Sequence, residues 1–299
     1  MTEEHTVVPL LEPREGIPPV MADGRGLQET VAAFAGGSGP VAVDAERASG
    51  YRYGNRAYLV QLRRVGSGSA LIDPIACPDL TSLDQAVSGA EIVLHAATQD
   101  LPCLAEIGFK PSALFDTELA GRLLGYERVG LGTMVETVLG LRLEKGHSAA
   151  DWSTRPLPED WLRYAALDVE VLVELRDSLH AELAETGKLE WAQEEFAAIL
   201  DTPPPAPRSD PWRRTSGIHK VRNVRGLAIV RELWTMRDRL AREADLAPGR
   251  VLPDAAIVSA ALDVPRTKKA LTEISAFTGR SARRHMSDWL AAVGRARAL

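Results

Sequence analysis

Short apolar segments occur early in the chain, and helical spacing follows them. Four segments are rich in Val, Leu, Ile and Tyr and are bounded by Gly, Asn or Pro: residues 41–47, 56–64, 69–74 and 91–96. Such runs are typical of β-strands. Apolar residues recur at helical spacing in five further stretches: 78–88, 98–108, 116–125, 131–140 and about 158–199. Strands interleaved with helices predict an α/β domain with a mixed sheet.

A proline-rich segment then interrupts the pattern. Residues 201–211, DTPPPAPRSDP, hold five prolines, which favour an extended linker over helix or central strand. Beyond it, apolar residues recur only at helical spacing, which predicts a small all-α helical bundle. The predicted organisation has four parts: a mobile N-terminal tail at 1–26, an α/β domain at 27–200, a linker at 201–216 and a helical domain at 217–299.

Composition narrows the class of protein. Of the 299 residues, 45% are hydrophobic and 25% charged, as in soluble globular proteins. No apolar run approaches the roughly 18 residues of a membrane span, and the acidic start differs from a signal peptide. The two cysteines, Cys77 and Cys103, form no CxxC motif, so we expect no disulfide partner and no structural zinc site. These features favour a cytoplasmic location and no membrane partner.

Charge is divided unevenly along the chain. The formal net charge is −6, yet from Arg208 onward there are 19 Lys and Arg against 9 Asp and Glu. The first 207 residues hold 16 basic and 32 acidic residues. This division suggests carboxylates that bind metals in the front domain and cations that attract phosphates in the back domain. The alternative is that the basic helical surface only keeps the protein soluble.

Asp44 and Glu46 lie two residues apart in a predicted strand, VAVDAER. Side chains at that spacing point to the same face, so the two carboxylates converge. Val41 and Val43 indicate a strand at the centre of a sheet, where unpaired acids are costly. A divalent cation would offset the repulsion, and an oxygen-rich ligand set favours Mg²⁺ or Mn²⁺ over zinc. The alternative is that acids at a strand end meet solvent or a nearby arginine.

Two other acids are candidates in predicted helices. Asp100 lies in the first turns of a helix, where an acid also simply favours the helix dipole. Tyr164 and Asp168 are four residues apart and share one helix face. The alternative for this pair is a core tyrosine whose hydroxyl finds a hydrogen-bond partner. None of these residues defines a site by itself.

Taken in order, the acids resemble a known pattern. A strand D-x-E is followed by an Asp at a helix start and then by a helical Y-x-x-x-D, as in the DEDD exonuclease superfamily and its DEDDy branch. The sister branch requires a histidine at position 163, which is Arg163 here. Five segments between about residues 27 and 186 are similar to those of ribonuclease D: LHAATQDL, FDTELAGRLLG, GLGTMVETVLG, LEKGHSAADWSTRPL and YAALDVEVL. Residues 217–298, with LAREADLAPGRVLPD, look like the helicase-and-RNase-D C-terminal (HRDC) domain.

The resemblance implies a ribonuclease H-like exonuclease fold and a metal-dependent 3′→5′ exoribonuclease. Its implied partners are RNA, with tRNA precursors as the expected class, and its products are nucleoside 5′-monophosphates. Two divalent cations, Mg²⁺ or Mn²⁺, would be held by four acids, and a tyrosine would orient the attacking water: Asp44, Glu46, Asp100, Asp168 and Tyr164. Substrate contacts are expected from the loop before the last catalytic helix: Lys145, Trp152 and Arg155. The alternatives are a DNA 3′→5′ exonuclease and a catalytically silent RNA-binding protein.

The sequence departs from the family pattern in three places. Arg47 follows the D-x-E pair, where the family usually has an apolar or aromatic residue, and this change is expected to alter how the terminal nucleotide packs. The segment HAATQD lacks the asparagine found in many members of the superfamily. The chain also ends before a second helical module would fit, which suggests either a shortened protein or less processive binding of RNA.

Overall fold

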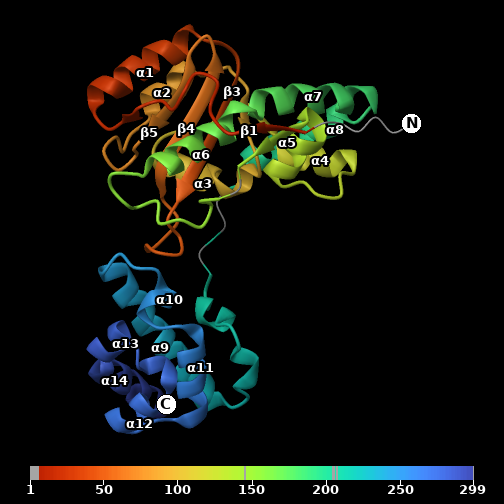
Figure 1. The fold of residues 1–299 in the computed structure, drawn as a ribbon. Coiled ribbons are helices and arrows are strands. Elements are labelled where there is room, and N and C mark those ends of the chain that lie inside the picture. The colour runs from red at the N-terminus through yellow and green to blue at the C-terminus, as the bar shows by residue number, and fades with distance from the viewer. Residues whose placement is uncertain (1–6, 145, 204–205, 207, 299) are drawn as a thin grey trace. The chain divides into compact units, whose positions relative to one another are not determined.

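The computed structural model describes residues 7–144, 146–203, 206 and 208–298 (Figure 1). The chain forms two compact units, and one short segment from within the sequence of unit 1, Ser49–Asn55, belongs to unit 2. Unit 1 is made of Met1–Ala48 and Arg56–Pro204, and unit 2 of Ser49–Asn55 and Pro205–Leu299. The division after Pro204 falls within the predicted linker.

Unit 1 contains a six-stranded mixed sheet, as the apolar pattern predicts. The strand order is β2-β5-β4-β3-β6-β7. β4 runs antiparallel to β3 and β5, whereas the β3–β6, β6–β7 and β2–β5 pairs are parallel. The strands, in this spatial order, are β2 (Val20–Met21), β5 (Gly68–Ile72), β4 (Ala57–Val65), β3 (Ser38–Arg47), β6 (Ile92–Leu94) and β7 (Leu114–Asp116).

Helices surround this sheet and share its hydrophobic core (Figure 1). The long helical stretch predicted at about 158–199 consists of three helices, α6, α7 and α8. Gly187, with a φ of +69°, lies between α7 and α8 in a conformation that favours glycine. The helices are α1 (Gly24–Gly36), α2 (Thr81–Ala86), α3 (Leu101–Glu106), α4 (Thr117–Leu124), α5 (Leu131–Leu139), α6 (Glu159–Glu170), α7 (Leu172–Glu185) and α8 (Leu189–Asp201), with a 3₁₀ turn η1 (Ala97–Gln99).

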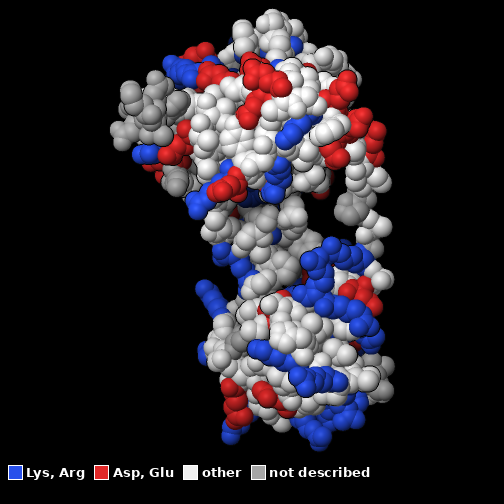
Figure 2. All heavy atoms as spheres, turned by 90° about the vertical axis from the view of Figure 1, so that its right-hand side faces the viewer, with Lys and Arg blue, Asp and Glu red and all other residues white. Residues whose placement is uncertain are grey.

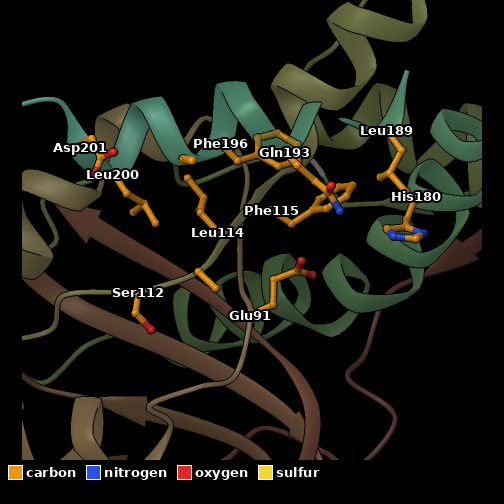
Figure 3. Close-up of a pocket in the computed structure, with 12 residues that line it drawn as sticks. Glu91, Ser112, Leu114, Phe115, His180, Leu189, Gln193, Phe196, Leu200 and Asp201 are labelled. Carbon is orange, nitrogen blue, oxygen red and sulfur yellow. The ribbon is translucent and has the colours of Figure 1, made fainter. Parts of the chain in front are cut away.

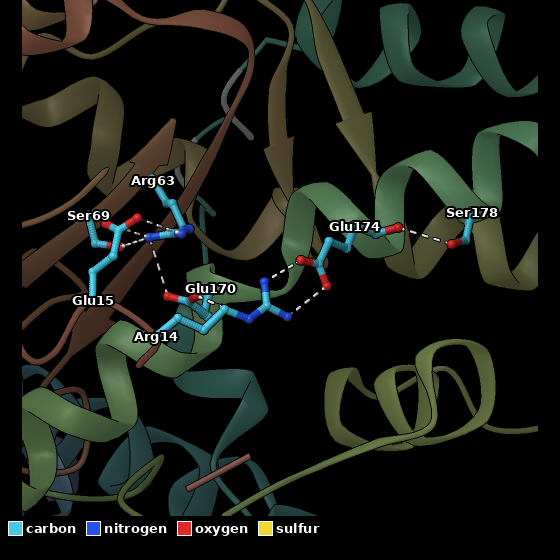
Figure 4. A network of polar contacts seen from close by, with 7 residues as sticks. All are labelled: Arg14, Glu15, Arg63, Ser69, Glu170, Glu174 and Ser178. Atoms are coloured by element: carbon cyan, nitrogen blue, oxygen red, sulfur yellow. Dashed lines mark hydrogen bonds and ion pairs between the residues drawn. The ribbon is translucent and has the colours of Figure 1, made fainter. Parts of the chain in front are cut away.

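The prediction of a mobile tail at 1–26 is wrong for its described part. β1 (Val8–Leu10) pairs with β8 (Leu141–Leu143), and β2 joins the main sheet. Figure 4 shows Arg14 between two acids: it forms a hydrogen-bonded ion pair with Glu174, and its Nε lies 3.8 Å from Oε1 of Glu170. Arg63 approaches Glu170 from β4 at 3.3 Å. Arg14 thus ties this segment to the buried carboxylate of Glu170, which requires a nearby cation.

The secondary structure of unit 2 consists of helices without strands across its described residues, as predicted. Its core includes Leu233 and Trp289, and buried Arg237 pairs with Asp254 at 2.5 Å. The predicted linker extends too far, because Trp212 is buried in this core. The helices are α9 (Val224–Glu243), α10 (Pro248–Val251), α11 (Asp254–Asp263), α12 (Lys268–Glu273), α13 (Arg280–Arg284) and α14 (Met286–Arg297), with 3₁₀ turns η2 (Pro211–Arg214), η3 (Ile218–Lys220) and η4 (Ser275–Phe277). Across the described residues, no helix combines the length and apolar character that crossing a bilayer requires.

Candidate active site

The sheet brings two of the acid-bearing segments to one edge. β3 and β6 are parallel neighbours, with Ala42 opposite Val93. Because parallel strands end at the same edge of a sheet, the end of β3 and the turn after β6 lie together. Asp44 and Glu46 are near the end of β3, and Asp100 follows β6 through η1.

Three carboxylates converge at this edge. α6 packs against β3, β4 and β5, and it carries Asp168 toward the β3 acids. One carboxylate oxygen each from Asp44, Glu46 and Asp168 lies within 4.8 Å of the other two. The three acids that the sequence analysis grouped, from elements more than a hundred residues apart, thus lie together and could hold a metal ion.

Burial and mutual repulsion disfavour the charged forms of these acids. Glu46 is 9% exposed and Asp168 is 8% exposed. Burial, together with the charges of Asp44, Asp168 and Asp100, raises the pKa of Glu46 to about 10. Burial raises the pKa of Asp44 to about 6, and burial followed by the Asp44 charge raises the pKa of Asp168 well above its usual range. A divalent cation fits this group, because it would stabilise the ionised carboxylates.

Asp100 lies at the same edge and is paired with a cation of the chain itself. Asp100 is 4% exposed, and burial followed by the Asp44 charge raises the pKa of its carboxyl to about 8. Nη1 of Arg47 lies 3.2 Å from Oδ1 of Asp100. That oxygen is nevertheless buried without a hydrogen bond. A buried carboxylate oxygen with an unused lone pair is suited to a metal ligand.

Asp116 holds the turn that precedes Asp100, and this role was not predicted from the sequence. Its two carboxylate oxygens accept hydrogen bonds from the backbone N–H groups of Ala96 at 3.0 Å and Ala97 at 2.9 Å. The same carboxylate caps α4 by accepting from Glu118 and Leu119. Ala96 has a φ of 60°, a conformation that is costly for a residue other than glycine. Asp116 thus fixes the strained corner between β6 and η1.

Gln61 supports Asp44 from the neighbouring strand and was also missed. The β3–β4 register places Gln61 beside Asp44, and its Nε2 donates to Oδ2 of Asp44 at 3.0 Å. Gln61 is fully buried. A polar residue inside the apolar run LVQL was the available signal, because a buried amide in a central strand requires a partner.

Tyr164 hydrogen-bonds to Asp168, as their spacing on one helix face allows. Burial and the charges of Asp168 and Glu46 raise the pKa of Tyr164 above its usual range, so its phenol stays protonated. Trp152 contacts Tyr164 at a ring-centroid distance of 6.4 Å. Trp152 itself is fully buried, and its Nε1 donates to the carbonyl of His147 at 3.1 Å. The predicted contact of Trp152 with substrate is therefore wrong, because its side chain is fully buried and its ring packs against Trp161 and Tyr164.

Arg155 is a structural residue, which contradicts its predicted contact with substrate. Its Nε and Nη2 donate to the two oxygens of Asp73 at 2.7 and 2.9 Å. Its remaining N–H groups donate to backbone carbonyls of Trp152, Thr154 and Tyr58. With every donor used, the guanidinium anchors the loop before α6 and is not free for a phosphate. Lys145, the third predicted contact, lies outside the described residues.

A separate hollow of about 320 Å³ occurs in unit 1, between β7 and α8 (Figure 3). Its lining includes Glu91 and Ser112, which precede β6 and β7, so it lies at the starts of these strands rather than at their ends. Phe115 and Phe196 line it, with their rings 4.9 Å apart. Glu91 is already paired with Arg176 at 2.6 Å. The acid group, and not this hollow, is therefore the candidate active site.

Comparisons with known families agree with the two units. A family model described as 3'-5' exonuclease matches residues 20–184, which include all four acids and Tyr164. A second model, for the HRDC domain, matches residues 226–293.

Curated relatives named ribonuclease D are found in many bacteria. The protein from Gluconacetobacter diazotrophicus is 32% identical over 269 residues, which cover 87% of this chain and 67% of that protein. The one from Acidiphilium cryptum is 34% identical over 212 residues, which cover 67% of this chain and 53% of that protein. The chain thus spans between about half and two thirds of the length of these relatives.

Solved structures confirm the predicted fold. A protein from Bifidobacterium adolescentis is 42% identical, with a TM-score of 0.92 over 98% of this chain and 77% of that one. Escherichia coli RNase D, described as an exoribonuclease involved in structured RNA processing, is 29% identical, with a TM-score of 0.74 over 94% of this chain and 75% of that one. The α/β exonuclease unit and the helical unit are both present, and the chain belongs to the ribonuclease D family.

Proposed function

We propose that this chain is a 3′→5′ exoribonuclease that hydrolyses the terminal phosphodiester of RNA and releases nucleoside 5′-monophosphates. The observation that carries this proposal is the convergence of Asp44, Glu46 and Asp168 within 4.8 Å, with Asp100 at the same sheet edge. Such a group of buried acids is unfavourable in a folded protein unless cations occupy it. Membership of the ribonuclease D family supports phosphodiester hydrolysis as its use.

Two divalent cations, Mg²⁺ or Mn²⁺, are the proposed cofactors. Glu46 and Asp168 would hold one, Asp100 the other, and Asp44 both. Hard cations of this kind prefer oxygen ligands, and the acids offer only oxygens. When bound, the cations supply Lewis acidity, which favours hydroxide over water and neutralises charge on the leaving 3′-oxygen.

The side chains of the chain itself position the reacting groups. Tyr164 keeps its proton, because its pKa is raised, so its hydroxyl donates a hydrogen bond rather than accepting a proton. Its link to Asp168 fixes the ring beside the acid group, where it would orient the attacking water. Gln61 holds the carboxylate of Asp44, and Asp116 holds the turn before Asp100. The acids would therefore need little reorganisation to bind cations.

RNA is the proposed partner, and tRNA precursors are the proposed class. Over unit 2, Figure 2 shows broad areas of Lys and Arg with few acids. One hollow of about 680 Å³ in this unit is lined by Arg280, Arg283 and Arg284 beside apolar Leu240 and Val251. The three arginines are exposed, and neighbours three or four apart on a helix repel each other. RNA phosphates would relieve this repulsion. We propose that the protein acts in the cytoplasm.

Two alternatives remain distinguishable by experiment. A DNA 3′→5′ exonuclease would use the same acids, because the 2′-hydroxyl takes no part in the metal chemistry. A silent RNA-binding protein would bind RNA without turnover. Assays on an RNA strand and, separately, on a DNA strand of the same sequence distinguish the three possibilities.

The first prediction concerns hydrolysis. With Mg²⁺ or Mn²⁺, a 5′-labelled RNA with a single-stranded 3′ extension gives a ladder of products shortened from the 3′ end, and chelation stops it. Asp44→Asn abolishes the ladder, because Asp44 is proposed to contact both cations, whereas the exposed control Asp177→Asn retains it. Gel analysis and chromatography of released monophosphates measure the outcome. Tight RNA binding without any ladder contradicts the proposal, and faster hydrolysis of the DNA strand contradicts the RNA assignment.

The second prediction concerns stability without metal. Because the acids have raised pKa values, the folded state binds more protons than the unfolded state above about pH 4, so stability falls as pH rises. In chelator, the melting temperature therefore falls between pH 5 and 8. Asp168→Asn reduces this fall and raises the melting temperature at pH 8, by roughly 2–4 °C for each kcal/mol of relieved repulsion. It also removes most of the stabilisation by Mn²⁺. The control Asp177→Asn changes neither the pH dependence of the melting temperature nor its increase by Mn²⁺. If the melting temperature of Asp168→Asn falls with pH as steeply as that of the wild type, the prediction is wrong.

The third prediction concerns the basic hollow. In chains carrying Asp44→Asn to block hydrolysis, the triple change Arg280→Gln, Arg283→Gln and Arg284→Gln weakens binding of single-stranded RNA about tenfold. It lowers the salt slope of log affinity by about 2, since each phosphate contact contributes about 0.7. Fluorescence anisotropy at several salt concentrations measures both quantities. The matched control removes the same charge elsewhere in unit 2, through Arg266→Gln, Lys268→Gln and Lys269→Gln. Equal losses in both variants would show that net charge, and not the hollow, binds RNA.

A further inference from the structure

Arg47 ends the strand that carries Asp44 and Glu46, and the proposed hydrolysis gives it no role. The pairing of β3 with β4 shifts between Glu46, opposite Leu59, and Arg47, opposite Ala57. Such a shift bends a strand and redirects the side chain that follows it. The guanidinium of Arg47 reaches the segment after β6, where it contacts Asp100 and the backbone carbonyl of Gln99.

The contact between Arg47 and Asp100 is incomplete. Arginine and carboxylate groups often pair through two parallel hydrogen bonds of about 2.7–2.9 Å. Here a single Nη1–Oδ1 distance of 3.2 Å joins them, and Oδ1 of Asp100 has no hydrogen bond. Nη1 donates instead to the carbonyl of Gln99. Arg47 therefore supplies a positive charge to Asp100 without occupying the lone pairs of that oxygen.

A second pair in unit 1, Arg63 and Glu170, resembles the pair of Arg47 and Asp100 but differs from it in two respects. Arg63 on β4 also faces a buried carboxylate, that of Glu170, at 3.3 Å. Glu170, however, receives a second cation, Arg14, and it is not one of the four proposed metal ligands. Arg47 is thus the arginine whose acid partner is a proposed metal ligand, and Arg63 is its natural control.

We propose that Arg47 is the resident counter-ion of Asp100, which a divalent cation displaces when it binds there. Arg47 is then a positioning residue: it keeps Asp100 folded in place without metal, and it lowers the affinity of the Asp100 side for metal. The inference rests on the proposed metal role of Asp100. It also gives a physical consequence to the arginine that departs from the family pattern at this position.

The test is a Mn²⁺ titration of the full chain by calorimetry, together with thermal unfolding in chelator. Arg47→Gln removes the charge but keeps an N–H donor for Gln99. This variant is expected to unfold at a lower temperature in chelator and to bind Mn²⁺ about tenfold more tightly, within the range by which neighbouring residues tune metal sites. Arg47→Lys restores the charge and is expected to restore the wild-type affinity.

The control Arg63→Gln also unfolds at a lower temperature in chelator, yet its Mn²⁺ affinity stays at the wild-type value. Unchanged or weaker Mn²⁺ binding by Arg47→Gln overturns the inference, as does an equal gain in Arg63→Gln. If Arg47→Gln is unfolded in chelator, recovery of its fold by Mn²⁺ supports the inference and failure to recover overturns it. If the wild-type chain binds no Mn²⁺, the proposed function itself is contradicted. This outcome distinguishes failure of the proposed function from failure of the inference about Arg47.

Discussion

The repulsion among the carboxylates that β3 and α6 bring together is the constraint on which the rest of unit 1 depends. Asp44, Glu46 and Asp168 lie within 4.8 Å of one another, and burial raises the pKa of each. An arrangement this unfavourable persists only where surrounding structure imposes it. Function and stability therefore oppose each other here: the group that is suited to cations is the group that destabilises the metal-free fold.

The surrounding structure opposes this repulsion through hydrogen bonds and charges from several elements. Gln61 reaches across the β3–β4 register to Asp44, and Asp116 holds the strained Ala96 corner before Asp100. Arg155, in the loop before α6, donates to Asp73 and so holds this loop in place. Each of these residues fixes a segment that carries an acid or adjoins one. The active site is thus a property of the sheet and its connections, and not of four side chains alone.

The sequence predicted the acids but not their supports, for a physical reason. Alternation along a strand and four-residue spacing along a helix are local geometry, so Asp44 with Glu46, and Tyr164 with Asp168, follow from spacing. Gln61 and Asp116 act across strand pairs, and register is invisible without tertiary structure. Trp152 and Arg155 were misassigned because nearness in the chain does not reveal whether a side chain is covered: one is fully buried, and the other has every donor used. The ordered segment at residues 7–26 was missed for a similar reason, since its partners Glu170 and Glu174 are far away in the sequence.

The central claim is that the buried acids form a metal site, and crystals soaked in Mn²⁺ test it most directly. Anomalous scattering from manganese locates the ions without assumptions about activity. Two peaks are expected at this sheet edge, one contacted by Asp44, Glu46 and Asp168 and the other by Asp44 and Asp100. The absence of manganese at these acids in a well-ordered soaked crystal, or its binding only elsewhere on the chain, would contradict the account.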